Sequence, residues 1–264
     1  MTPARQCGVS TTLIAWTVLA ALVVPLVIIA VLAFSPEMAL ILPPPSFSTK
    51  WFGELLKREQ FQTGIVYSAQ LALFSAAFGL FASVGVAYAI ARYRFPGRGL
   101  IHGLVMSPLI VPEIVTGLAL LIWFNQVALR WTDARIVLLH SLLVLPFMVR
   151  VLTASLQQSD RNLEDAARLL GAHPVTAFVR VTLPTIRQGI AAALIFAVVV
   201  SFHNFTATLF LITNKETLPI TIFGYIRAGG SDPATAALST VLIGVTSLIV
   251  LAVDRWIGIE RVSR

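Results

Sequence analysis

Long apolar runs alternate with short polar segments along this chain. The first run, Leu13 to Phe34, has 22 residues and no charged side chain, which is enough for a helix to cross about 30 Å of hydrocarbon. Five further apolar runs follow, at about residues 65–91, 100–124, 136–152, 190–211 and 236–253. The pattern predicts an all-α membrane protein with six transmembrane helices.

The first apolar run has a cleaved signal peptide as its alternative interpretation. The run is longer than the usual apolar core of 7–15 residues, and no small-x-small cleavage site ends it, so we expect a retained span. The following polar segment, residues 35–63, contains three consecutive prolines, a stiff connector. Apolar residues at helical spacing then predict a short amphipathic helix at the membrane surface: Trp51, Phe52, Leu55 and Leu56.

Small residues recur every fourth position in the second run, at Ser75, Gly79, Ser83 and Ala87. Such a ladder lets another helix approach closely. The alternative is a generic alanine-rich span with no particular packing partner.

The third and fifth runs carry polar groups that are costly in lipid. Pro108 and Pro112 weaken the helical hydrogen bonding of the third run, and Glu113 follows them at its middle. A carboxylate at that depth costs about 2.5–3.5 kcal/mol, so we expect it to face the bundle interior or a water-filled path. It could instead be protonated or bonded to a neighbouring helix. The outer half of the fifth run contains Ser201, His203, Asn204, Thr206 and Thr208.

The polar segment between the fourth and fifth runs predicts a capped helix and a turn. Asn162 is a candidate N-cap, and Asp165 lies three residues later, where a capping box places its acceptor. Alanine and leucine favour helix up to Gly171, the expected left-handed stop. Pro174 can open a second short helix, which Pro184 ends. This segment must meet water or another protein.

Composition and charge agree with a single membrane domain. The chain has 264 residues, of which 57% are hydrophobic and 12% charged, against about 25% charged in soluble domains. The net charge of +7 is spread over short loops and does not form a nucleic-acid surface. Twelve of the 19 Lys and Arg residues fall inside if both termini are cytoplasmic, and seven fall outside. This bias places both termini and the segment 162–184 in the cytoplasm.

Signatures of catalysis are missing from the sequence. No P-loop G-x-x-x-x-G-K-[ST] and no H-E-x-x-H occurs. The four histidines do not pair at metal spacing, and the single cysteine, Cys7, excludes an internal disulfide and a cysteine metal cluster. We therefore expect no catalytic residue, no bound cofactor and no metal, and a chain that is not an enzyme.

One motif resembles a known family. Asp165-Ala166-Ala167, three residues, Gly171, nine residues and Val181-x-Leu183-Pro184 resemble the EAA loop of binding-protein-dependent ABC importer permeases, E-A-A-x3-G-x9-I-x-L-P. Asp165 replaces Glu and Val181 replaces Ile, both mild departures. The resemblance implies the type I importer permease fold, with residues 1–64 as an N-terminal transmembrane helix and periplasmic surface helix, 65–255 as the core and 256–264 as a cytoplasmic tail.

The resemblance also implies partners. In this family the EAA helix is a coupling helix that docks on a cytoplasmic ATPase subunit, which holds the ATP and Mg²⁺. The implied importer contains a second permease subunit, expected to be a paralogue, two ABC ATPase subunits and a periplasmic or lipid-anchored solute-binding protein in a bacterial inner membrane, with lipid around it and no nucleic acid. The implied ATPase-coupling residues are Glu164, Asp165, Ala166, Ala167, Leu170 and Gly171.

Within that family, the run 107–115 and the pattern around 217–233 resemble permeases for polyamines such as putrescine and spermidine. His203-Asn204 stands where many of these carry acidic residues, and importers of aminoethylphosphonate, thiamine or ferric ion have related permeases. The implied solute path comprises Glu113, Ser201, Phe202, His203, Asn204 and Thr206. Outside the family, the alternatives are a proton-coupled secondary carrier that uses Glu113 and a non-transporting membrane scaffold.

Overall fold

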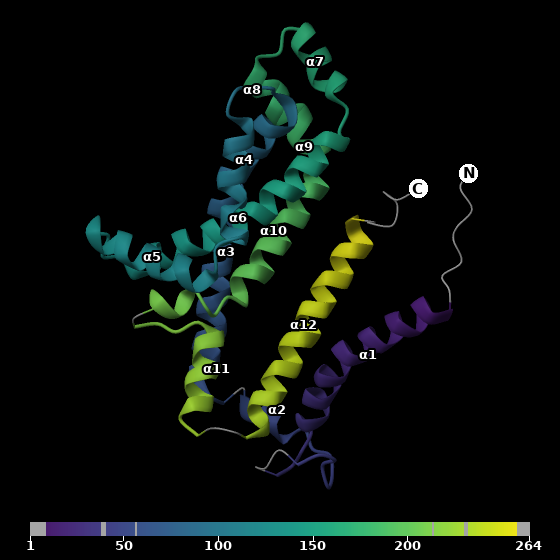
Figure 1. Cartoon of the computed structure of the whole chain (residues 1–264), viewed down its shortest axis with the longest axis vertical. Coiled ribbons are helices and arrows are strands. Elements are labelled where there is room, and N and C mark those ends of the chain that lie inside the picture. The colour runs from purple at the N-terminus through teal and green to yellow at the C-terminus, as the bar shows by residue number, and fades with distance from the viewer. Residues whose placement is uncertain (1–8, 38–40, 56, 213, 230–231, 258–264) are drawn as a thin grey trace. The chain divides into compact units, whose positions relative to one another are not determined.

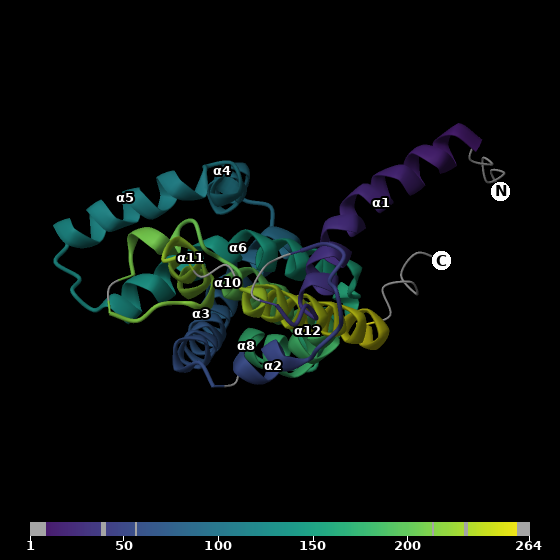
Figure 2. The same ribbon diagram turned by 90° about the horizontal axis from the view of Figure 1, so that it is seen from below.

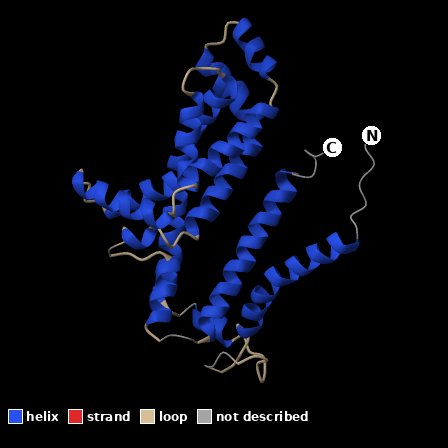
Figure 3. Cartoon of the chain, in the orientation of Figure 1, coloured by secondary structure: helices blue, strands red, loops and turns tan. Residues whose placement is uncertain are grey.

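The computed structural model describes residues 9–37, 41–55, 57–212, 214–229 and 232–257. In these ranges helices are joined by loops and turns, and there is no strand (Figure 3). The helices are α1 (Val9–Leu32), α2 (Lys50–Leu55), α3 (Glu59–Arg92), α4 (Arg98–Met106), η1 (Ser107–Leu109), α5 (Glu113–Gln126), α6 (Thr132–Gln158), α7 (Arg161–Leu169), α8 (Pro174–Ala177), η2 (Phe178–Thr182), α9 (Leu183–Thr185), α10 (Arg187–Phe202), η3 (Thr208–Phe210), α11 (Leu218–Arg227) and α12 (Pro233–Ile257).

Four of the described helices, α1, α3, α6 and α12, are each long and apolar enough to cross a membrane alone. Two bent pairs pass the same test together. The segment Arg98–Leu109 meets α5 at 105°, and Pro174–Thr185 meets α10 at 73°. Counting each bent pair as one span gives up to six, the number predicted, although the second pair begins at Pro174 and not near residue 190.

Two predicted spans are not the continuous helices that the apolar runs indicated. The run 100–124 breaks after η1, because Pro112 has no amide hydrogen to donate and its φ and ψ of −55° and 134° start a new helix at Glu113. The run 190–211 loses its helix at Phe202. His203 to Ala207 form a turn, and η3 closes the run. The polar cluster of the fifth run lies at this break.

The chain divides into two compact units, and the first comprises Met1–Phe61 and Gly224–Ile249. The predicted surface helix is α2, whose Trp51 is buried and donates from its indole nitrogen to the Ser35 carbonyl at 2.7 Å. Leu56, the last apolar residue named for this predicted helix, lies outside the described residues. The Asp232 carboxylate forms an ion pair with Arg58 at 2.6 Å. It also accepts a hydrogen bond from the Tyr225 hydroxyl at 2.7 Å. These contacts join the first and last parts of the unit.

The second unit, Gln62–Phe223 with Val250–Arg264, holds its core between α3, α6 and α10. Helices α6 and α10 run side by side in both views (Figure 1 and Figure 2). The predicted small-residue ladder faces α6, because a Cβ added at Gly79 would lie 3.0 Å from Val144 and 3.2 Å from Met148. Ser75, Ser83 and Ala87 are fully buried. The close helix approach that the ladder indicated is confirmed.

Gly189 makes the tightest helix contact in this unit, and replacing it with alanine should destabilise the chain. The added Cβ would lie 2.6 Å from Ser155 Cβ on α6, so the helix backbones must move apart, at a cost of about 1–3 kcal/mol. Thermal unfolding in detergent measures the effect. Gly85→Ala is the matched control, because nothing lies within 4 Å of its added Cβ. Equal unfolding temperatures for the two variants would contradict the packing described here.

Candidate functional site

Helix α7 and the turn after it form the first part of the candidate site. Asp160 caps α7, and its carboxylate accepts the Asn162 amide at 2.9 Å. The prediction that Asn162 is the N-cap and Asp165 its reciprocal acceptor is therefore wrong. The cap and the start of the helix both lie two residues earlier than predicted, and the exposed Asp165 instead forms an ion pair with Arg161 at 3.6 Å.

The end of α7 is a glycine stop, as predicted. Gly171 has a φ of +90°, which favours glycine over residues with a Cβ. Its amide donates to the Arg168 carbonyl, and the Ala172 amide donates to the Ala167 carbonyl, both at 3.0 Å. This pair of bonds is a Schellman motif. It reverses the chain and leaves the last residues of α7 at a tip.

A second helical stretch returns the chain to α10. The predicted helix at Pro174 is confirmed as α8, which His173 caps through the Val175 amide at 3.3 Å. The π-helical segment η2 and the short α9 continue it to Thr185. The break expected at Pro184 falls two residues later, at Ile186.

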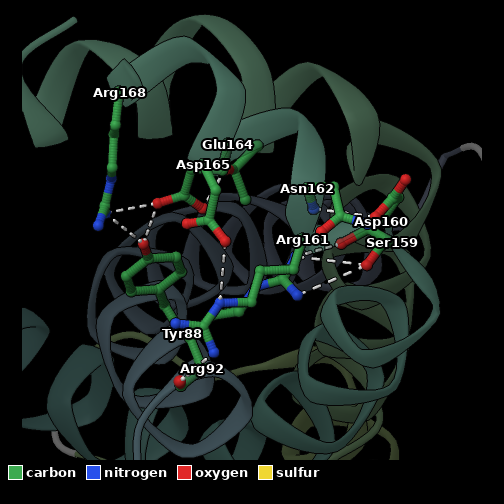
Figure 4. Close-up of polar contacts among 10 residues, drawn as sticks. Tyr88, Arg92, Ser159, Asp160, Arg161, Asn162, Glu164, Asp165 and Arg168 are labelled. Atoms are coloured by element: carbon green, nitrogen blue, oxygen red, sulfur yellow. Dashed lines mark hydrogen bonds and ion pairs between the residues drawn. The ribbon is translucent and has the colours of Figure 1, made fainter. Parts of the chain in front are cut away.

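Glu164 attaches α7 to the rest of the second unit. Its side chain is buried, and it accepts hydrogen bonds from the Tyr88 hydroxyl of α3, from Thr182 Oγ1 at 2.7 Å and from Arg168 Nη2 at 2.6 Å. Figure 4 shows Tyr88, Glu164 and Arg168 together. Burial favours the protonated form of Glu164, but the bonds from Tyr88 and Thr182 and the charges of Arg168 and Arg92 outweigh it and lower the pKa.

Arg92, at the end of α3, makes a second attachment. Its guanidinium donates to Ser159 Oγ at 2.6 Å, in the turn between α6 and α7. The Arg161 guanidinium donates in return to the Arg92 carbonyl at 3.3 Å (Figure 4). The base of α7 is thus bonded to α3 at two places.

The tip of α7 is apolar and exposed. Leu169 and Leu170 are each 90% exposed, although they end a helix that is otherwise rich in charged residues. Among the predicted coupling residues, Asp165, Ala166, Leu170 and Gly171 are exposed and Ala167 is half-buried, whereas Glu164 is buried. The Glu164 carboxylate therefore binds within the chain and is not presented to a partner.

The second part of the candidate site lies where the two spans break. Asn204 Nδ2 donates to Glu113 at 3.0 Å, and Asn204 Oδ1 accepts from Thr208 Oγ1 at 2.9 Å. The ring of His140 on α6 bonds to Ser201 Oγ at 2.7 Å and to Thr208 Oγ1 at 2.8 Å. One hydrogen-bonded chain thereby links α5, α6 and the end of α10.

This chain of bonds includes three of the six predicted path residues: Glu113, Asn204 and Ser201. Glu113 is bonded to Asn204 of a neighbouring segment, which was one of the alternatives to a place in a solute path. Glu113 nevertheless stays exposed. His203 instead bonds to the Val199 carbonyl of its own helix at 2.9 Å, and Phe202 and Thr206 are half-buried.

His140 was not among the predicted path residues. A lone histidine in the middle of an apolar run was the available signal, but its partners lie 61 and 68 residues away. No three metal-binding side chains gather at one point in the described part of the chain.

Comparison with known proteins places these features in a family. Residues 79–259 match the family described as "Binding-protein-dependent transport system inner membrane component". The chain is 29% identical over 211 residues to the putrescine transport system permease protein PotI of Escherichia coli K12, covering 77% of this chain and 75% of that one. It is 30% identical over 215 residues to the molybdenum transport system permease protein ModB of Haemophilus influenzae, covering 74% and 93%.

A solved structure has a similar fold. It is described as a bacterial ABC transporter involved in the import of the acidic polysaccharide alginate. The TM-score is 0.68 at 15% sequence identity, and the match covers 95% of this chain and 97% of the other.

Proposed function

Because the chain belongs to the family of binding-protein-dependent transport system inner membrane components, we propose that its α7 tip docks on the ATPase of an ABC importer. The chain is a multi-pass permease of the inner membrane and not a catalytic subunit. ATP hydrolysis falls to the partner. In this proposal α7 and both termini lie in the cytoplasm, as the positions of Lys and Arg indicate.

The observation that carries this proposal is the exposed leucine pair at the tip of α7. Leu169 and Leu170 are 90% exposed, and the segment cannot lie in lipid because charged residues surround the pair. Covering both leucines with a partner gains roughly 3–6 kcal/mol. Exposed Ala166 allows that partner to approach closely, and Asp165 offers it a negative charge.

The route of coupling follows from the attachments of α7. Glu164 bonds α7 to Tyr88 of α3 and to Thr182, and Arg92 bonds α3 to Ser159. A movement of the docked tip would therefore pull on α3 and on the stretch that leads into α10. We place the solute path at the far end of α10, beside Glu113, Ser201 and Asn204.

We propose a cationic solute of the polyamine class for this path. Relatives include permeases named for putrescine and for molybdenum, so the relatives alone do not separate the two classes of solute. Glu113 favours the cation. Its carboxylate is exposed at the break between the spans, and no Lys or Arg among the described residues lies within ion-pair distance of it.

Glu113→Gln should weaken the response to polyamine while leaving the fold intact. The amide keeps the side chain's size, and losing the charge removes about 1 kcal/mol or more of attraction to a cation. At least about fivefold more putrescine-loaded binding protein should be needed for half-maximal ATPase stimulation of the reconstituted importer. Glu216→Gln, which removes another exposed carboxylate, is the control.

Unchanged stimulation and uptake in the Glu113→Gln variant would remove Glu113 from the solute path. Stimulation by molybdate and not by polyamine would refute the solute class and leave the permease assignment standing.

A further inference from the structure

Two pockets rich in arginine adjoin each other at the α3–α4 turn of the second unit. The first has a volume of about 530 Å³, and arginines dominate its lining: Arg92, Arg94, Arg98 and Arg161. The second has a volume of about 510 Å³ and lies between α4 and α6, with Arg98, His102 and Arg150 in its wall. Arg98 belongs to both, so the two pockets share one cationic wall.

The positive charge of these pockets is largely uncompensated. No acidic residue lines either pocket. Among the arginines that line these pockets, only Arg161 has a carboxylate within ion-pair distance in the described part of the chain, the exposed Asp165. The charge of Arg92 also acts on the nearby Glu164. Cations held this close repel one another. The arrangement therefore favours an anion between them.

Two buried polar atoms in the pocket walls lack a hydrogen-bond partner. They are Arg92 Nε in the first pocket and Thr153 Oγ1 in the second. Buried polar atoms are almost always satisfied. Arg92 is nevertheless fixed in place, because the other end of its guanidinium bonds to Ser159. The protein itself therefore holds the Arg92 guanidinium at the wall of the first pocket.

Part of the wall of the second arginine pocket is apolar. Ile90, Met106 and Val149 line the second pocket. Ala154 of α6 also lines this pocket and is exposed. A free inorganic anion gains nothing from such a surface, whereas the acyl chains of a lipid do. The pairing of cations with an adjoining apolar wall thus fits an amphiphile.

We propose that the two pockets together bind one anionic phospholipid. Its phosphate lies among Arg92, Arg94 and Arg98, and its acyl chains follow Met106 and Ala154 of the second pocket. Basic pockets between helices on the cytoplasmic side suit anionic headgroups. The inference rests on the proposed function only for placing this end of the chain on the cytoplasmic side.

The site would also steady the coupling helix. Arg92 and Arg161 line the first pocket, and both take part in bonds at the base of α7. A headgroup phosphate would neutralise their repulsion and hold α3 and α7 together.

Native mass spectrometry of the purified full chain tests the proposal. The probes are phosphatidylglycerol and phosphatidylcholine with identical acyl chains, and inorganic phosphate. We expect one phosphatidylglycerol to stay bound per chain, in clear preference to phosphatidylcholine. The variant Arg94→Gln/Arg98→Gln/Arg150→Gln should weaken this binding about 100-fold, since each arginine near a membrane surface contributes about fivefold. Arg187→Gln, an exposed arginine outside both pockets, should bind as the unmodified chain does.

Retention of phosphatidylglycerol by the triple variant, or equal retention of both lipids, would overturn the proposal. Displacement of the lipid by millimolar phosphate would also overturn it and would make the site one for a free anion. Circular dichroism identifies a triple variant that fails to fold, and the single variant Arg94→Gln, with an expected fivefold loss, then decides. The assay uses neither ATPase nor solute, so failed uptake with intact lipid binding would refute the proposed function alone.

Discussion

Replacing Leu169 and Leu170 together with serine should abolish stable association between the permease and its ATPase. Both leucines are 90% exposed at the tip of α7, so the change costs the isolated chain almost nothing. In the complex it removes roughly 3–6 kcal/mol of apolar burial, which lowers the affinity by about 100-fold or more. Co-purification of the ATPase from detergent measures the loss, and uptake into cells should fall with it.

The matched control is Leu169→Met/Leu170→Met, which preserves the apolar area and should retain the ATPase. Thermal unfolding of the serine variant should equal that of the unmodified chain. An ATPase that still co-purifies with the serine variant, together with normal uptake, would show that the leucine tip is not the docking element.

Replacing Glu164 with alanine should release α7 from α3. The change leaves Arg168, the Tyr88 hydroxyl and Thr182 without their shared acceptor, at a cost of about 2–3 kcal/mol. Amide hydrogen exchange in α7 should accelerate roughly 30- to 100-fold as the helix opens more often. Asp165→Ala is the control, because its exposed pair with Arg161 is worth less than about 1 kcal/mol. Equal exchange in both variants would refute the anchoring role of Glu164.

The effect of pH on this anchor follows from the lowered pKa of Glu164. A carboxyl group whose folded pKa lies below its ordinary value of 4.5 stabilises the fold above that value, and the contribution is lost as pH falls through the folded pKa. The Glu164 anchor should therefore be constant between about pH 6 and pH 8. Exchange rates are first corrected for the intrinsic pH dependence of amide exchange. More frequent opening of α7 at pH 6 than at pH 8 would then contradict anchoring by an ionised Glu164.

The features that could be predicted from the sequence depend on residues that lie close together along the chain. Apolar runs indicated the long helices, and small residues at every fourth position indicated the close contact of α3 with α6. Gly171 marked the end of α7, because a left-handed position after a helix strongly favours glycine. The start of α7 was predicted two residues late, since Asp160 and Asn162 are both good caps and the local sequence does not choose between them.

The features that were missed depend on contacts between distant parts of the chain. Glu164 and Asp165 are adjacent carboxylates, and only the position of Tyr88, 76 residues away, shows which one is buried. His140 likewise acquires its role from Ser201 and Thr208. Hydropathy also could not show that the third run breaks at Pro112 or that the helix of the fifth run ends at Phe202. An apolar run has the same composition whether its helix is continuous or broken.

ATP dependence of uptake in proteoliposomes distinguishes an ATP-driven importer from a proton-coupled carrier. The vesicles contain this permease with its partner permease and ATPase, and solute-loaded binding protein is added on the outer side. Solute should accumulate only when ATP is enclosed with the ATPase, and a proton uncoupler should leave the rate unchanged. Uptake that continues without ATP and collapses with the uncoupler would contradict the account and would favour a proton-coupled carrier that uses Glu113.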